Sequence, residues 1–209
     1  MQLLAMLTML VDHIGYVFFP DQIIWRMVGR LAFPIYAYCI VVGYRHTTSL
    51  KMYLLRLAVI GLISQIPYYL NNIEGLNVVG TLFVGLVVLY ILDRYKSGVL
   101  RILMTTAAAI VLELFSFDYG IYGLILILIY RYSKNGIMFL LHFMLNLAFM
   151  FTKGWYLAIF SSFSTLGIAY AQLLFSFIER IRIPKWLWRS FYPLHLSVLA
   201  LVNYIATKN

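Results

Sequence analysis

Charged residues are scarce in this sequence. The chain has 209 residues, of which 11% are charged and 64% hydrophobic, and seven Asp and Glu residues stand against 16 Lys and Arg residues. A soluble globular domain is about one quarter charged and about half apolar. The composition therefore argues against a soluble domain. Because no polar linker interrupts the apolar runs for more than a few residues, we expect a single domain over residues 1–209.

Cysteine and the common catalytic motifs are also nearly absent. Cys39 is the single cysteine, so the chain cannot form an internal disulfide or a cysteine metal cage, and Cys39 is expected to be a small core residue. No metal-ligand cluster, Gly-rich phosphate loop at a cytoplasmic position or nucleophile elbow is present. The sequence therefore predicts no metal site.

Long apolar runs make up most of the chain. A hydrocarbon core needs roughly 20 apolar residues, with about 17 as the lower limit. The candidate spans are residues 3–19, 24–43, 52–70, 78–92, 100–117, 119–130, 136–151, 156–178 and 186–205. The sixth is short, and could be a half-span or extend into Arg131 and Tyr132. We predict an all-α, polytopic transmembrane helical bundle of about nine spans, with eight as the alternative.

The first apolar run is expected to be a spanning helix and not a cleavable signal peptide. No basic residue precedes Leu3, no small-residue cleavage site follows the run, and the run itself contains Asp12 and His13.

Basic and non-basic loops alternate along the chain. The loops after the second, fourth, sixth and eighth spans contain Arg45, Lys51, Arg94, Lys96, Arg131, Lys134, Arg180, Arg182, Lys185 and Arg189. The intervening loops contain Asp21, Glu74, Asp118 and the lone Lys153. Basic loops of membrane proteins face the cytoplasm, which predicts a multi-pass protein of the cell membrane with its N-terminus cytoplasmic and its C-terminus outside. The net charge of +9 thus reflects orientation in the bilayer and not nucleic-acid binding.

Ionisable residues occur inside five of the predicted spans. They are Asp12, His13, Arg26, Arg30, Glu113, His142 and His195. Such residues are costly in lipid and are candidates for a functional role by default.

Asp12 is expected to pair with Arg26 or Arg30, which are four residues apart and share a helix face. Asp12 and His13 are adjacent, so their side chains point about 100° apart and each needs a partner on another helix. The ion pair either only stabilises the contact between two helices, or it leaves one arginine free to bind a substrate carbonyl or phosphate.

The histidines allow both structural and chemical interpretations. His13 could act as a general base, or simply bond to a neighbouring carbonyl or tyrosine. His195 shares a helix face with Tyr192, and Pro193 between them frees a backbone carbonyl, which occurs both at sites and at simple kinks. His142, one turn before Asn146, predicts interhelical hydrogen bonding.

Five blocks of the sequence resemble the TraX family, in the same order and over nearly the whole chain. They are residues 7–15 (LTMLVDHIG), 29–36 (GRLAFPIY), 55–57 with 63–68 (LRL, ISQIPY), 118–123 (DYGIYG) and 191–196 (FYPLHL). The founding member acetylates the N-terminal amine of F-type conjugative pilin. The family also resembles multi-helix acyltransferases such as heparan-α-glucosaminide acetyltransferase, which use cytoplasmic acetyl-CoA and a histidine within the membrane. The family's Asp-His pair falls on Asp12 and His13, and its late histidine on His195.

The resemblance implies a membrane acetyltransferase that moves an acetyl group from acetyl-CoA to an amine or hydroxyl of a membrane-associated peptide or glycan. His13 is the first candidate for the catalytic imidazole, as a general base or as a transiently acetylated group. His195 and Tyr192 would orient it or relay protons, and Asp12 and Arg30 would order the first two helices around the site.

Arginines are the candidates for binding the phosphates of acetyl-CoA. Arg56 and Arg101 each lie at the predicted inner mouth of a span, and Arg30 is the third candidate. One rival function is a small transporter or channel, whose His, Arg and Asp residues would form a substrate or proton path. A second rival is a structural membrane subunit. A convergent set of cations at the inner rim would favour the acetyltransferase.

Overall fold

The computed structural model describes residues 1–171 and 183–208, and within these ranges the fold is all-α, as predicted. The helices are α1 (Gln2–Phe18), α2 (Ile23–Gly29), α3 (Ala32–His46), α4 (Leu50–Leu70), α5 (Val78–Arg94), α6 (Gly98–Leu114), α7 (Gly120–Tyr132), α8 (Asn135–Lys153), the 3-10 helix η1 (Tyr156–Ser161), α9 (Ser162–Tyr170) and α11 (Lys185–Lys208). The end of the predicted eighth span, Arg180 and Arg182 lie outside the described residues.

Several helices have the length and composition of membrane spans. The segments Ile23–His46, Leu50–Leu70 and Asn135–Lys153 are long and apolar enough to cross a bilayer, and Gln2–Phe18, Gly120–Tyr132 and Tyr156–Tyr170 are shorter apolar helices. The outer surface carries large apolar side chains: Leu62 and Leu114 are each 74% exposed and Phe151 is 81% exposed. An apolar outer surface of this kind is typical of helical membrane proteins. The number of spans and their orientation stay predictions.

The predicted second span, residues 24–43, is not one straight helix but two, α2 and α3, with a break at Arg30 and Leu31. Pro34 explains the break, because it has no backbone N–H and its ring crowds the carbonyl four residues earlier, which is that of Arg30. Ser164 of α9 donates a hydrogen bond of 2.8 Å to the carbonyl of Leu31. The break therefore places Arg30 between two helices and not on a continuous helix face.

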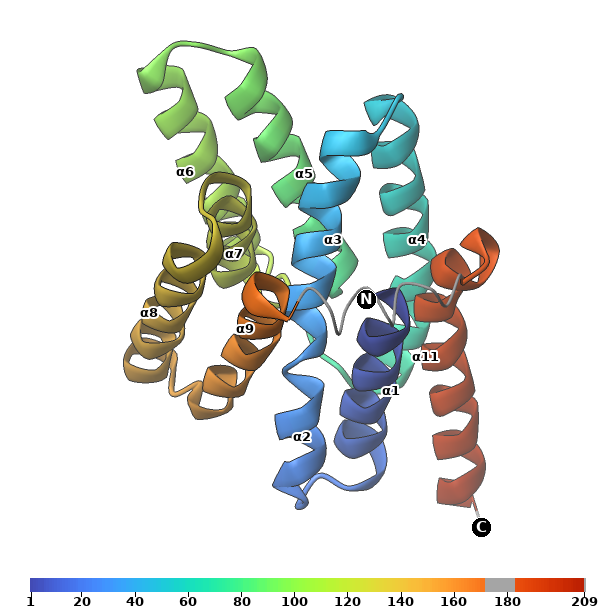
Figure 1. The fold of residues 1–209 in the computed structure, drawn as a ribbon. Coiled ribbons are helices and arrows are strands. Elements are labelled where there is room, and N and C mark those ends of the chain that lie inside the picture. The colour runs from blue at the N-terminus through green and yellow to red at the C-terminus, as the bar shows by residue number, and fades with distance from the viewer. Residues whose placement is uncertain (172–182, 209) are drawn as a thin grey trace.

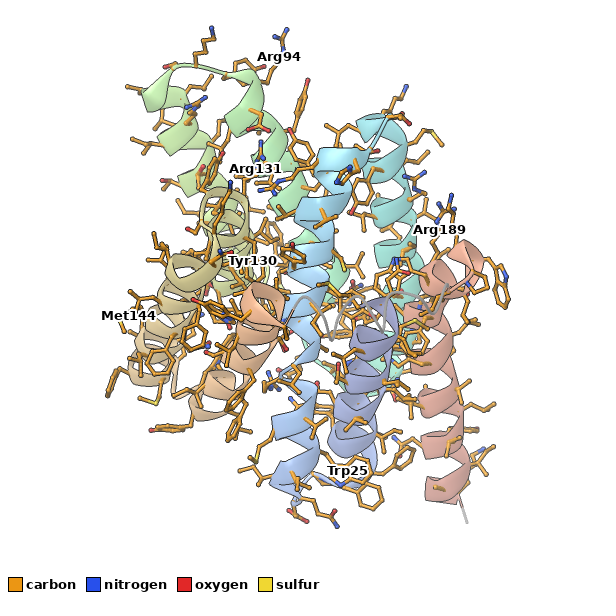
Figure 2. All side chains as sticks on the ribbon, in the orientation of Figure 1. Trp25, Arg94, Tyr130, Arg131, Met144 and Arg189 are labelled. Atoms are coloured by element: carbon orange, nitrogen blue, oxygen red, sulfur yellow. The ribbon has the colours of Figure 1, made fainter. Side chains whose placement is uncertain are left out.

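Three connections between helices lie at opposite ends of the molecule. Figure 1 shows the α3–α4 and α5–α6 connections at the upper end, and the α1–α2 connection and the C-terminus at the lower end. Arg94 and Arg131 lie in the upper half and Trp25 near the lower end (Figure 2). This arrangement agrees with the alternation of basic and non-basic loops. The N-terminus lies below the upper ends of α3 and α4 (Figure 1).

Two glycines let α1 and α2 pack closely. A Cβ atom on Gly29 of α2 would overlap the side chain of Asp12 on α1, and a Cβ atom on Gly15 of α1 would overlap Trp25 on α2. Small residues at a helix–helix contact allow the two backbones to approach each other in this way. The contact holds the carboxylate of Asp12 against the last turn of α2.

Candidate active site

Helices α1 and α11 bring His13 and His195 together, although 182 positions separate them in the sequence. Nδ1 of His13 lies 2.7 Å from Nε2 of His195. Nδ1 of His195 lies 2.7 Å from the carbonyl oxygen of Phe191, one turn earlier in α11. The two imidazoles therefore form a chain that starts at a backbone carbonyl.

This chain of hydrogen bonds defines the tautomers of the two imidazoles when both are neutral. A carbonyl oxygen only accepts, so Nδ1 of His195 carries its hydrogen and Nε2 of His195 is an acceptor. His13 must then donate through Nδ1, which leaves the lone pair of its Nε2 available for a proton. The arrangement is that of an oriented general base, with His195 in the place where other sites use a carboxylate.

Aromatic side chains hold the two rings in position. The ring planes of His13 and His195 differ by 14°, and Phe191 stacks on His195 with ring centroids 4.7 Å apart. The ring of Tyr192 lies 6.2 Å from that of His13 and 5.6 Å from that of His195. His195 and Tyr192 are buried. The structure thus brings together three of the four residues predicted to be catalytic.

Asp12, the fourth, forms the predicted ion pair with the second span. Its Oδ1 lies 2.9 Å from Nη1 of Arg26 and 3.9 Å from Nη2 of Arg30. Nη1 of Arg26 also donates to the main-chain carbonyl of Asp12 at 3.4 Å. Arg26 is therefore the closer partner, and Arg30 turns partly away, with its Nη1 donating to the hydroxyl of Tyr119 at 3.3 Å.

The loop before α7 adds two residues that the sequence analysis did not assign to the site. Tyr119 has a positive φ of 62° and stacks on Phe33 with ring centroids 3.9 Å apart, which places its hydroxyl at Arg30. Burial raises the pKa of the neighbouring Asp118 to about 6, although Arg30 acts in the opposite direction. The sequence signal was available, because residues 118–123 form one of the blocks that resemble the TraX family.

A first cavity, of about 330 Å³, lies on the N-terminal side of the histidine pair along α1 and α11, and neither histidine lines it. Met9 of α1 and Tyr192 of α11 line it, and they lie four and three residues before His13 and His195. Four residues of helix rise about 6 Å. Along the helix axes, the pair therefore lies about one turn from two residues of the cavity wall.

Three cations also line this first cavity: Arg56 of α4, with Lys185 and Arg189 of α11. No described lining residue is acidic, and none of the three forms an ion pair with a described acidic residue. The guanidinium of Arg56 lies 5.8 Å from the ring centroid of Tyr53. Arg189 lies near the start of α11 (Figure 2). The cavity thus has an apolar interior and positive charge on its wall.

The other two arginines predicted to bind acetyl-CoA do not line this cavity. Arg101 is on α6, where its Nε donates to the carbonyl of Tyr95 at 2.6 Å. Arg30 contacts Asp12 and Tyr119 instead. Of the three predicted arginines, Arg56 alone belongs to the first cavity.

A second cavity, of about 500 Å³, lies on the C-terminal side of the pair along the same two helices, and neither histidine lines it. Tyr16 of α1 and Asn203 of α11 line it, and they follow His13 and His195 along their helices. Arg26 and Asn71 contribute as well. Along both helices, the histidine pair therefore lies between the two cavities.

His142 belongs to a separate polar centre formed by α7, α8, η1 and α9. Its Nδ1 lies 2.5 Å from Oγ1 of Thr165, and its Nε2 lies 2.9 Å from the hydroxyl of Tyr122 and 3.1 Å from Oγ of Ser161. Tyr122 also donates to Asn146 at 2.8 Å. The predicted interhelical hydrogen bonding of His142 is confirmed, and both of its ring nitrogens are occupied.

Glu113 also has a structural partner, since its Oε2 lies 2.6 Å from Nζ of Lys153. Within residues 1–171 and 183–208, no group of three His, Cys, Asp or Glu side chains is placed to hold a metal ion.

Comparison with known proteins identifies the family. No curated protein and no solved structure is a significant match. The family model described as TraX protein matches residues 1–203 of the 209, which include both histidines of the pair and all three cations of the first cavity. The chain belongs to the TraX family.

Proposed function

We propose that this TraX-family protein is an integral membrane acetyltransferase, which moves an acetyl group from acetyl-CoA to an acceptor amine or hydroxyl. The observation that carries the proposal is the oriented His13–His195 pair between two cavities, one of which is lined by cations. Membership of the TraX family is consistent with this chemistry. An oriented base between a donor cavity and an acceptor cavity is the minimum that acyl transfer requires.

The reaction uses His13 as a general base. Nε2 of His13 takes the proton of the acceptor amine or hydroxyl while the acceptor atom bonds to the acetyl carbon. The carbon–sulfur bond of the thioester breaks, and the resulting thiolate takes the proton from the imidazolium. His195 accepts the hydrogen bond from Nδ1 of His13 throughout, which keeps the ring oriented and supports its positive charge. Base catalysis of this kind contributes typically 10²–10⁴-fold.

The alternative chemistry is transient acetylation of His13 at Nε2, followed by transfer to the acceptor. Rapid quenching with labelled acetyl-CoA, in the absence of an acceptor, distinguishes the two routes. Label bound to the protein, and lost in His13→Ala, would indicate the covalent route; unlabelled protein with full turnover would indicate direct transfer.

The first cavity suits the donor. Phosphates are bound by converging Arg and Lys side chains, and Arg56, Lys185 and Arg189 supply them. A volume of about 330 Å³ is near the lower limit of small-molecule sites, ~300 Å³. It suits the narrow pantetheine arm and the acetyl group, with the nucleotide at the basic rim.

The proposed orientation has the N-terminus and the basic loops in the cytoplasm, where acetyl-CoA is made, and the C-terminus outside. Reporter fusions after Thr47 and after Lys96 should report the cytoplasm, and a fusion after Asn72 the outside. Fusions after Thr47 and Asn72 that report the same side would contradict this orientation.

Incubation of purified protein with isotope-labelled acetyl-CoA and candidate acceptors tests the function. We expect one acetyl group to be added to an acceptor, as read by mass spectrometry, and a dependence on His13. Saturable movement of a solute across proteoliposomes without any acetylated product would instead indicate a transporter.

A further inference from the structure

Three of the seven described residues that line the second cavity have amide side chains. Asn71, Asn72 and Asn203 line it together with Tyr16, whose hydroxyl donates to the carbonyl of Asn72 at 3.3 Å. Its volume of about 500 Å³ is within the range of small-molecule sites, roughly 300–1,000 Å³. We infer that this cavity binds the acceptor, and that it selects a neutral, hydroxyl-rich acceptor, a sugar or a sugar headgroup, over the ammonium group of a peptide. The inference rests on the proposed acetyltransferase function.

Asn71 contributes a hydrogen-bond acceptor that has no partner. Its Nδ2 donates to the carbonyls of Pro67 at 2.7 Å and Leu196 at 2.9 Å, and two carbonyl partners require that this atom be the nitrogen. The amide oxygen, Oδ1, is consequently the other atom, and it is buried without a hydrogen bond. An unpaired buried acceptor is unfavourable. Because protein atoms cover this oxygen, a ligand hydroxyl would reach it only after a shift of the cavity wall.

Asn71 is also tied to the reactive centre. Leu196, whose carbonyl it contacts, directly follows His195 in α11. On the other wall, Tyr16 lies three residues after His13 and so shares its helix face. A ligand bound between Asn71 and Tyr16 would therefore lie about one helical turn beyond His13 along α1.

The charges at the cavity disfavour a cationic acceptor. Arg26 is the one ionised side chain among the described residues that line it, and no carboxylate lines it. Asp12, the nearest carboxylate in contact with a lining residue, is 2.9 Å from Arg26 and 3.9 Å from Arg30. Asp21, which follows Pro20 in the chain, is not part of the lining. An ammonium group would find no free anion at this wall, because Asp12 is already paired with Arg26, and so it gains no affinity from charge.

The same arrangement gives little advantage to an anion, because the charge of Arg26 is already matched by Asp12. Amides and a half-open tyrosine suit a neutral polyol instead. Amide groups both donate to and accept from hydroxyls, and the ring of Tyr16, which is 38% exposed, offers an apolar face to the C–H side of a sugar ring.

Competition between acceptors tests the inference. The protein is purified in a polyoxyethylene detergent, because a maltoside detergent would itself present a sugar headgroup. It is then given labelled acetyl-CoA with a pool of neutral disaccharides, a pool of dodecyl disaccharide glycosides, or a tripeptide with a free N-terminus. We expect acetylated sugar from at least one of the first two arms, and these arms distinguish a soluble sugar from a lipid-borne headgroup.

Each other result overturns a different claim. Acetylation of the tripeptide alone would overturn the sugar preference and leave the acetyltransferase function intact. No acetylation of any acceptor would count against the proposed function. The inference would then be decided by binding: thermal stabilisation by either sugar pool that is lost in Tyr16→Ala supports it, and no stabilisation overturns it.

Two matched pairs of variants sharpen the test. Asn72→Asp adds a carboxylate to the lining at a residue whose positive φ of 57° Asp tolerates. It should raise the ratio of peptide to sugar acetylation by roughly tenfold or more, whereas Asn72→Gly, which adds no charge, should leave this ratio unchanged.

Tyr16→Ala should raise KM for the sugar about tenfold with kcat retained, and Tyr16→Phe should preserve KM, since the ring remains. An unchanged acceptor ratio in Asn72→Asp, together with an unchanged KM in Tyr16→Ala, would exclude this cavity as the acceptor site.

Discussion

His13 and His142 both lie inside the helical bundle, and both contact a second polar side chain at short range, yet their surroundings differ in one decisive respect. Both ring nitrogens of His142 are hydrogen-bonded to side chains of neighbouring helices. His13 has one such bond, to His195, and its other nitrogen has none among the described residues. A fully bonded histidine stabilises packing, while a half-bonded and oriented one can exchange a proton with a ligand.

The two regions also differ in access. The His13–His195 pair lies between two cavities, and Asp12 and Arg26 beside it are partly exposed, with side chains 14% and 25% accessible. His142 and its partner Thr165 are completely buried. Burial, hydrogen bonding and access to a cavity therefore distinguish His13, as the reactive histidine, from His142, as the structural one. The residue type alone does not distinguish them.

The largest expected effect is the loss of turnover when the reactive histidine, His13, is replaced. His13→Ala should lower kcat for acetyl transfer by roughly 10²–10⁴-fold, because the base is lost while the helix remains. Turnover of the purified, correctly inserted variant measures it. His46→Ala, at the end of α3, is the matched control and should keep wild-type turnover. Unchanged turnover in His13→Ala would remove this residue from the mechanism.

Asp12→Asn should give the next largest effect, on stability. Removing one partner of a fully buried ion pair costs roughly 3–5 kcal/mol, because the other charge is left uncompensated. This pair is partly exposed, so that range is the upper bound for Asp12→Asn. Denaturant unfolding in detergent measures the free energy. A double-mutant cycle should show stronger coupling of Asp12 to Arg26 than to Arg30, in line with the distances of 2.9 and 3.9 Å. Absence of coupling to both arginines would contradict the ion pair.

His142→Leu breaks the structural side of the comparison. It should lower the free energy of unfolding by about 1–3 kcal/mol, because Thr165 and Tyr122 each lose a buried hydrogen-bond partner. Acetyl transfer per folded molecule should remain at the wild-type level. A variant that is stable but inactive would mean that the reactive centre had been assigned to the wrong histidine.

The smallest effect concerns the donor cavity. Arg56→Ala should raise KM for acetyl-CoA roughly tenfold with kcat unchanged, since one of three cations is lost. Arg101→Ala, which removes the same charge from α6, away from the cavity, should leave KM unchanged and serves as the control. Binding of acetyl-CoA and ATP with equal affinity, abolished by salt, would indicate non-specific attraction to the basic face.

Sequence patterns predicted the helices better than they predicted the site. The lengths of the apolar runs and the basic loops gave the helical segments, because both depend on local composition. Pro34 accounts for the break at Arg30. The sequence alone did not predict it, because a proline in the first turn of a helix causes no break. Depth in the bundle can be estimated from position in a run. The side of the bundle on which a helix lies cannot be estimated in this way. Arg56 and Arg101 therefore looked equivalent in the sequence, whereas in the structure Arg56 lines the first cavity and Arg101 does not.

The contact between His13 and His195 lies beyond local patterns altogether. It joins α1 to α11 and depends on the packing of the whole bundle. The ordered blocks that resemble the TraX family pointed to both residues, but not to the direction of the hydrogen bond between them. The second cavity had no sequence signal at all, because its walls come from four separate stretches of the chain.

Transfer across a sealed bilayer tests the two-cavity account most directly. The protein is reconstituted into proteoliposomes, and the population with its basic loops facing outward is selected by binding to an affinity tag placed at Thr47. Acetyl-CoA is added outside, and the neutral sugar pool is sealed inside. We predict acetylated sugar in the lumen, with none formed by His13→Ala. Acetylation only when donor and acceptor share one side of the membrane would contradict a histidine pair that works between two opposed cavities.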